Sequence, residues 1–150
     1  MNILQNNPYR LLGVYSNSPT KERLANHNRM KAFLKVGKSV SFPLDVPQYL
    51  SSINRTEASA ADAEAKLTLP KDQILHAQFW FIKTTPLDEV AFNHLFAGEI
   101  DKAEEIWQKR ECLSALQNRI VCALIRNRYD SAIKCAEVLY GNTQYLNQFV

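Results

Sequence analysis

The first half of the chain carries apolar residues at helical spacing over residues 19–36. They lie three or four positions apart and fall on one side of a helix: His27, Met30 and Leu34. Ser18 followed by Pro19 is a typical helix start, and Gly37 is a typical C-terminal stop. The pattern predicts a helix from Pro19 to about residue 36. Two prolines within residues 39–52 indicate that a loop follows it.

Two more helices are predicted in the first half. An alanine-rich segment that begins between Ser52 and Thr56 favours a helix to about Leu67. Pro70 ends this helix because its ring removes a donor and clashes with the preceding turn. A further helix is predicted over residues 71–83. Its apolar side is formed by Leu75, Phe79 and Ile82.

The apolar run Phe79–Ile82 presents large side chains around most of a helix turn. One side is expected to fill the core of the first half, and residues 90–92 of the next helix are expected to cover the rest. Trp80 is therefore predicted to be buried between the two halves. Its replacement by Ala is expected to cost about 3 kcal/mol, as for large aromatic truncations in cores.

The second half predicts four helices separated by short turns. Their ranges are 87–97, 100–109, 111–126 and 129–140. A weak internal repeat places Gly98 over Asn127 and Ala103 over Ala132, with an offset of 29 residues. Gly and Asn tolerate the left-handed backbone of a reversing turn, and the alanines permit close helix packing. Residues 144–150 read as the opening of another helix, so the native chain is expected to continue past Val150.

Composition supports a mainly helical protein. The 150 residues are 46% hydrophobic, which is ample for a packed core. They include only 4 Gly and 6 Pro, so residues that favour turns are few. We predict an all-α chain with a first module over residues 1–86 and a second over residues 87–150.

Candidate chemistry is sparse. The three histidines stand alone, without metal-ligand spacing: His27, His76 and His94. Three cysteines spaced 10 and 13 residues apart match neither a disulfide framework nor a zinc motif, and they predict buried reduced thiols: Cys112, Cys122 and Cys135. No phosphate-binding loop or nucleophile motif occurs. The sequence therefore predicts no enzymatic activity, no catalytic residues, no metal and no cofactor. Without a signal peptide or an apolar run that could span a bilayer, it predicts a cytoplasmic protein with no membrane partner.

Two short motifs in the first half resemble those of the J-domain of DnaJ-like co-chaperones. The opening Tyr-x-x-Leu-Gly-Val motif is carried by Tyr9, Leu12, Gly13 and Val14. A later Ala-x-x-x-Leu-x-x-Pro motif is carried by Ala63, Leu67 and Pro70. The resemblance covers residues 8–82 and implies a short opening segment, a basic helix, a loop and two further helices.

In that family a His-Pro-Asp tripeptide after the basic helix triggers ATP hydrolysis by the partner heat-shock chaperone. The corresponding place here holds Lys35-Val36-Gly37, no His-Pro pair exists in the chain, and the loop is longer. The resemblance therefore implies a degenerate module without the trigger.

The predicted basic helix and its end carry six cations against one acid. The candidate partner-binding residues are Lys21, Arg23, Arg29, Lys31, Lys35 and Lys38. In the family this helix docks on an acidic chaperone surface, which charge attraction alone would favour. The run can also be the solvated face of a surface helix, or a nucleic-acid contact whose affinity falls steeply with salt. We expect Arg29, Lys31 and Lys35 to be exposed and not fully paired within the chain.

The second half resembles tetratricopeptide-like helical hairpins, which commonly bind proteins or peptides. The leading hypothesis is a non-enzymatic interaction adaptor built on a degenerate J-domain, with a chaperone as its candidate partner. One alternative is a J-type co-chaperone that still stimulates a heat-shock ATPase. The other is a nucleic-acid-binding helical domain. The net charge of +3 is mild and does not by itself imply nucleic acid.

Overall fold

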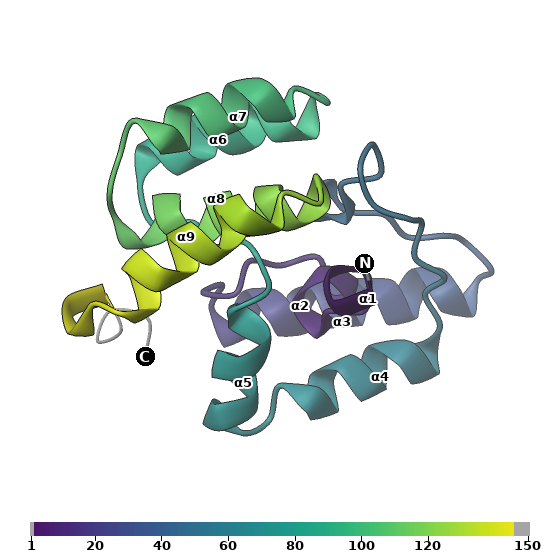
Figure 1. Cartoon of the computed structure of the whole chain (residues 1–150). Helices are drawn as coiled ribbons and strands as arrows, with labels where there is room; N and C mark the ends of the chain where they lie inside the picture. Colours follow the sequence, from purple (N-terminus) through teal and green to yellow (C-terminus); the bar gives the residue numbers. More distant parts are fainter. Residues whose placement is uncertain (1, 146–150) are drawn as a thin grey trace.

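The computed structural model describes residues 2–145, and the regular structure in this part of the chain is helical, without a strand (Figure 1). The all-α prediction is confirmed. The helices are α1 (Asn2–Gln5), α2 (Pro8–Leu11), α3 (Thr20–Lys35), η1 (Pro43–Asp45), α4 (Glu57–Lys66), α5 (Pro70–Ala77), α6 (Pro86–Phe96), α7 (Ile100–Gln108), α8 (Leu113–Ile125) and α9 (Tyr129–Tyr140). Among these helices, none combines the length and the apolar character that a bilayer crossing requires.

Helix α3 is the predicted basic helix, and its two ends differ in how well they were predicted. Gly37 has φ +73°, and the N–H of Lys38 donates to the Phe33 carbonyl at 2.9 Å. This is the expected glycine stop. Ser18 is not the N-cap, however. Its hydroxyl instead accepts the Tyr15 N–H at 3.0 Å, while Pro19 occupies the cap position without a side-chain bond.

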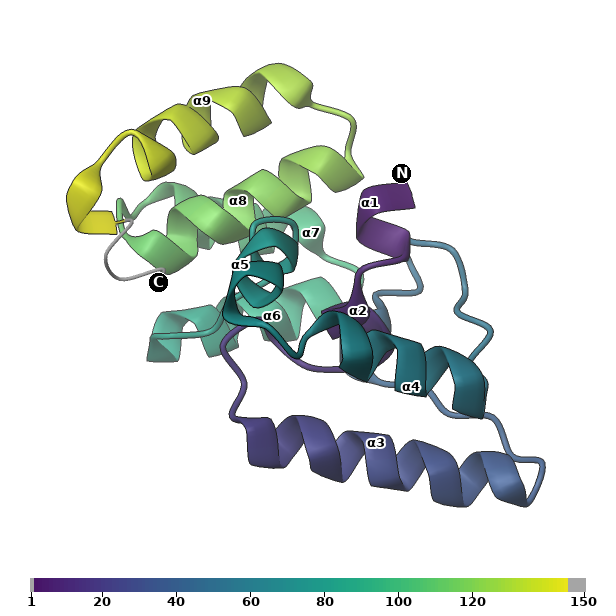
Figure 2. The same cartoon turned by 90° about the horizontal axis from the view of Figure 1, so that it is seen from below.

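Helices α3 and α4 lie side by side and run antiparallel (Figure 2). Arg23 near the start of α3 pairs with Glu64 near the end of α4. Thr56 caps α4, because its hydroxyl accepts the Ser59 N–H while the Ser59 hydroxyl accepts the Thr56 N–H. Ala60 is fully buried on α4, and its small side chain permits close approach of the helices.

The helix predicted over residues 71–83 is wrong in its second half, since α5 ends at Ala77. The predicted apolar side fails with it, and Leu75 is 52% exposed. The cause lies in α8. The Gln117 amide donates to the carbonyls of Ala77, Gln78 and Trp80 at 2.9 to 3.3 Å. Asn118 holds both the N–H and the C=O of Ile82, at 2.9 and 2.8 Å. The carbonyls of Gln78, Trp80 and Ile82 therefore bind side chains of a distant helix rather than the N–H groups of a further helical turn.

The second half forms two helical hairpins, α6–α7 and α8–α9. The predicted turns are confirmed, because Gly98 and Asn127 have φ +82° and +58° where the chain reverses. Ala103 and Ala132 are buried one turn into the following helices, as the repeat predicted. Each hairpin therefore combines a left-handed turn residue with a small residue at the helix contact.

One hydrophobic cluster contains buried residues from both sides of Pro86. Trp80 is fully buried, as predicted, and its indole N–H donates to the Val14 carbonyl at 3.0 Å. The ring of Phe81 meets Phe92 of α6 edge-on at 5.4 Å. A smaller cluster fills the space between α8 and α9. The two parts of the chain thus share the aromatic centre of one core.

Candidate partner-binding surface

The side of α3 that faces solvent carries a basic stripe, which we define as Lys21, Leu24, Asn28, Lys31 and Lys35. These residues follow one another at intervals of three or four, so they share one side of the helix. All five residues are exposed. Leu24, the apolar residue between the lysines, is 46% exposed. Within residues 2–145 the three lysines form no hydrogen bond or ion pair. The stripe therefore presents free ammonium groups around one apolar side chain.

Two of the predicted binding residues on α3 lie outside the stripe. Arg23 is half-buried, and its Nε lies 3.3 Å from both carboxylate oxygens of Glu64. Arg29 is exposed, as predicted, but it leaves the helix on another side. Its guanidinium lies 5.5 Å from the Phe33 ring centre and 6.0 Å from that of Phe42. The sixth residue, Lys38, is exposed in the loop after the helix.

His27 lies beneath the stripe, at the contact between α3 and α4. Its Nδ1 is 4.0 Å from a Glu64 oxygen, and its Nε2 is buried without a hydrogen-bond partner. Arg23 and His27 thus share Glu64 as their acidic neighbour. The acid neutralises the inner side of α3 and leaves the stripe outside its reach.

The long loop after α3, over residues 36–56, is folded against the rest of the first half. A buried ion pair holds this loop: Arg55 donates to the two oxygens of Asp45 at 2.8 and 2.5 Å. Asp45 also accepts the Phe42 N–H at 3.2 Å. The loop is therefore a folded element with its own polar centre.

A second buried arginine ties this loop to the N-terminal helices. Arg10 is 1% exposed, and its guanidinium donates to the carbonyls of Gln5, Asp45 and Ser51 at 2.6 to 3.2 Å. Burial lowers the pKa of Arg10, while Asp45 opposes this effect. The guanidinium binds only backbone oxygens, so its role is to fix three chain segments around one charge.

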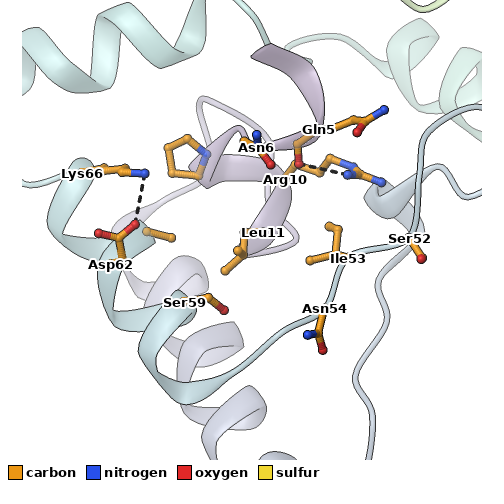
Figure 3. Close-up of a pocket in the computed structure, with 12 residues that line it drawn as sticks. Gln5, Asn6, Arg10, Leu11, Ser52, Ile53, Asn54, Ser59, Asp62 and Lys66 are labelled. Atoms are coloured by element: carbon orange, nitrogen blue, oxygen red, sulfur yellow. Dashed lines mark hydrogen bonds and ion pairs between the residues drawn. The ribbon is translucent and has the colours of Figure 1, made fainter. Parts of the chain in front are cut away.

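A polar hollow of about 420 Å³ lies between α4 and the α1–α2 segment (Figure 3). Lys66 and Asp62 on its α4 side pair with each other at 3.0 Å. Arg10 on the opposite side turns to the Gln5 carbonyl, as Figure 3 shows. The charged groups that line the hollow are thus engaged within the chain, and they do not define a ligand.

The histidines and cysteines lie apart from one another. In the part of the chain that the structure describes, no group of three or more His, Cys, Asp and Glu side chains could hold a metal ion. His94 pairs with Glu99, with 3.1 Å between Nδ1 and Oε1. Cys122 and Cys135 are buried as free thiols, as predicted, whereas Cys112 is only half-buried.

The residues that hold the fold through buried polar bonds were not predicted from the sequence. They are Asn7, Arg10, Asp45, Arg55, Gln117 and Asn118. The available signal was a polar residue inside an apolar run, as for Gln117 and Asn118 in the middle of α8. Such residues are buried only where they find partners, and those partners lie about 40 residues away. Comparison with protein families, with curated proteins and with solved structures gave no match for this chain.

Proposed function

We propose that this chain is a protein-interaction adaptor without enzymatic activity, and that the basic stripe of α3 docks on an acidic protein surface. Lys31 and Lys35 lie four residues apart and repel one another, so their arrangement is unfavourable until an acidic partner approaches. Leu24 in the middle of the stripe favours a protein over a purely ionic partner, because it offers apolar area to bury. This unpaired stripe is the observation that carries the proposal.

The partner class follows from the J-domain resemblance. A short helix, a basic helix, a loop, an antiparallel alanine-rich helix and a further helix follow one another as that family would have them. Tyr9, Leu12 and Leu67 of the two motifs are buried, and Pro70 begins α5. An acidic surface of a heat-shock chaperone is therefore the first partner to test.

The loop argues for docking without stimulation of the chaperone. Lys35-Val36-Gly37 takes the place of the family's His-Pro-Asp tripeptide. The residues that follow fold around Asp45 and Arg55 instead of forming a short exposed loop. The proposed adaptor binds the chaperone and leaves its ATPase rate unchanged.

The helical hairpins supply a second surface for the adaptor. Tyr129 and Ile133, which lie four residues apart on one side of α9, are 48 and 55% exposed. Exposed faces of stacked hairpins commonly bind proteins. We infer that the hairpins carry a second protein while α3 engages the first.

The decisive experiment measures binding of the full chain to a purified heat-shock chaperone from the same organism. The triple variant K21Q/K31Q/K35Q removes the charge of the stripe. We expect its affinity to fall at least tenfold at low salt, and the difference to shrink when salt is raised. The parent chain should leave the ATPase rate unchanged.

The matched control is K71Q/K83Q/K102Q, which removes the same charge from exposed lysines elsewhere. The control should bind like the parent, and both variants should keep the parent's circular dichroism. An equal loss of affinity in both variants would mean that net charge, and not the stripe, determines binding. A saturable rise in ATP hydrolysis would support an active co-chaperone instead, and tight binding of an oligonucleotide through the stripe would support the nucleic-acid alternative.

A further inference from the structure

A second concentration of positive charge lies in the hairpin part, at a cavity of about 400 Å³. The cavity is bounded by the turn between α7 and α8, by α8 and by α9, which lie side by side in Figures 1 and 2. Four cations line it, Lys109, Arg110, Arg119 and Lys134, and Glu111 is the one acid among its lining residues. We call this cavity the Arg119 pocket. None of these residues belongs to the basic stripe of α3.

Arg119 is the unusual member of the pocket. Its side chain is half-buried on α8, yet within residues 2–145 it forms no hydrogen bond and no ion pair. Arg126, two turns later on the same helix, shows the ordinary arrangement and pairs with Asp101 and Glu104 of α7. A guanidinium removed from part of its water needs replacement acceptors. The pocket leaves room for such acceptors beside Arg119.

The cations that line the pocket beside Arg119 add charge without supplying an acceptor. Glu104 of α7 attracts Arg119 electrostatically but forms its ion pair with Arg126. Arg110 and Lys134 are exposed and have no ion-pair partner in the described chain. Lys109 forms an ion pair at 3.7 Å with Glu105, a residue that does not line the pocket. Burial raises the pKa of the Cys135 thiol, with Arg119 opposing the shift, so the thiol at the pocket wall adds no negative charge at neutral pH. The excess of positive charge is left to a ligand.

We propose that the Arg119 pocket binds the phosphoryl group of a small molecule. The planar guanidinium of Arg119 matches two phosphate oxygens at once, and Arg110 and Lys134 neutralise the remaining charge from either side. Leu116 and Val138 on the pocket wall leave apolar surface for the rest of the molecule. A cavity of this volume lies within the range of small-molecule sites. The cations converge on one hollow instead of following an extended path, which favours a compact anion over a nucleic-acid strand.

The test is calorimetric titration of the full chain with inorganic pyrophosphate at physiological salt. We expect saturable binding of one pyrophosphate per chain with a dissociation constant below 1 mM, and a higher unfolding temperature in its presence. Arg119→Gln should weaken binding at least tenfold, and Lys134→Gln severalfold. Arg128→Gln, an exposed arginine outside the pocket lining, is the control and should bind like the parent.

Further arms separate the possible outcomes. Arg119→Lys keeps the positive charge but loses the paired N–H donors of the guanidinium. It should bind pyrophosphate more weakly than the parent and more tightly than Arg119→Gln. If Arg119→Gln fails to fold, Arg119→Lys and Lys134→Gln decide the matter. Citrate should bind more weakly than pyrophosphate if the site reads phosphate rather than charge alone. The proposal is overturned if pyrophosphate does not saturate, if K21Q/K31Q/K35Q abolishes binding while Arg119→Gln does not, or if an oligonucleotide binds through Arg119 and pyrophosphate does not.

Discussion

Residues 2–83 and residues 86–140 are both built from short helices, but different contacts hold them in place. In the first part, buried side chains bind backbone carbonyls across long loops, as Arg10 and Arg55 do. In the hairpin part, neighbouring helices pack along their lengths and reverse at Gly98 and Asn127. A single substitution can remove a buried hydrogen bond completely, whereas the packing between two helices is distributed over many residues. The first part should therefore be the more sensitive to single polar substitutions.

The largest expected effect follows from breaking the Arg55–Asp45 pair. Arg55→Met should cost about 3–5 kcal/mol because it leaves the Asp45 carboxylate buried and unpaired. Lys102→Met breaks the exposed Lys102–Glu99 pair of the hairpin part and should change stability far less. Urea unfolding of both variants checks the difference. Equal losses would remove the distinction between the two parts.

Trp80 tests the core that the two parts share. Trp80→Ala should cost about 3 kcal/mol, since it empties a fully buried site beside Phe81. Trp80→Phe keeps much of the packing and loses the bond to the Val14 carbonyl, so about 1 kcal/mol is expected. Thermal unfolding should remain a single transition in both variants. Two separate transitions in Trp80→Ala would show that each part has a core of its own.

Asn118 tests whether α8 holds the segment that follows α5. Asn118→Ala leaves the N–H and the C=O of Ile82 without their partner, and a loss of about 2 kcal/mol is expected. Asn93 on α6 is exposed, and Asn93→Ala should change stability by less than about 0.5 kcal/mol. Hydrogen exchange should locate the loss of protection at Ile82. Protection that persists there would mean that the segment keeps its shape without Asn118.

The two turn residues allow a smaller and more local test of the hairpins. Gly98→Ala should cost about 1 kcal/mol because an L residue is strained at its positive φ. A steric clash adds nothing, because an added Cβ would meet only the Gln48 Cγ, at an ordinary contact distance of 3.6 Å. Asn127→Gly should change stability by less than about 0.5 kcal/mol, because glycine adopts the same backbone freely. Paired denaturant titrations compare them. A loss at Asn127 as large as that at Gly98 would show that its side chain matters beyond the turn.

The smallest effect concerns the pH dependence at Glu104. Burial raises the pKa of this carboxyl above its ordinary value, and Arg126 opposes the shift. A raised pKa in the folded state means that stability is higher below the unfolded value and is lost as pH rises through the folded value. Glu104→Gln should therefore exceed the parent by less than about 1 kcal/mol at pH 7. The advantage should vanish near pH 4 in unfolding measurements, and an advantage that grows on acidification would contradict the assignment.

The sequence predicted the hairpin part more closely than the first part, and the reason is local. Gly98, Asn127 and the two alanines act on their own neighbours, so periodicity and turn chemistry locate α6 to α9 within a few residues. The end of α5 depends on Gln117 and Asn118, which no local pattern connects with residues 78–82. An amide from another helix competed with the next helical turn and displaced it.

For the basic helix, the sequence predicted the exposure of the charges but not their grouping. The spacing of Arg23 indicates that it lies apart from the exposed lysines. It precedes His27 by four residues and Met30 by seven, so it shares the inner side of α3 with them. The Arg119 pocket had no such signal. Its cations come from a turn and two helices, and only the packing of α8 against α9 brings them together.

The amide bonds from α8 to residues 77–82 also constrain how the chain can acquire its structure during synthesis. When the ribosome has added residue 86, the partners of Ile82 and Trp80 on α8 have not yet been made. The early part of the chain must then wait for more than 30 further residues before its backbone bonds close. Contacts so far apart in sequence slow folding and leave apolar surface open in the meantime. A fragment of residues 1–86 is therefore expected to be aggregation-prone.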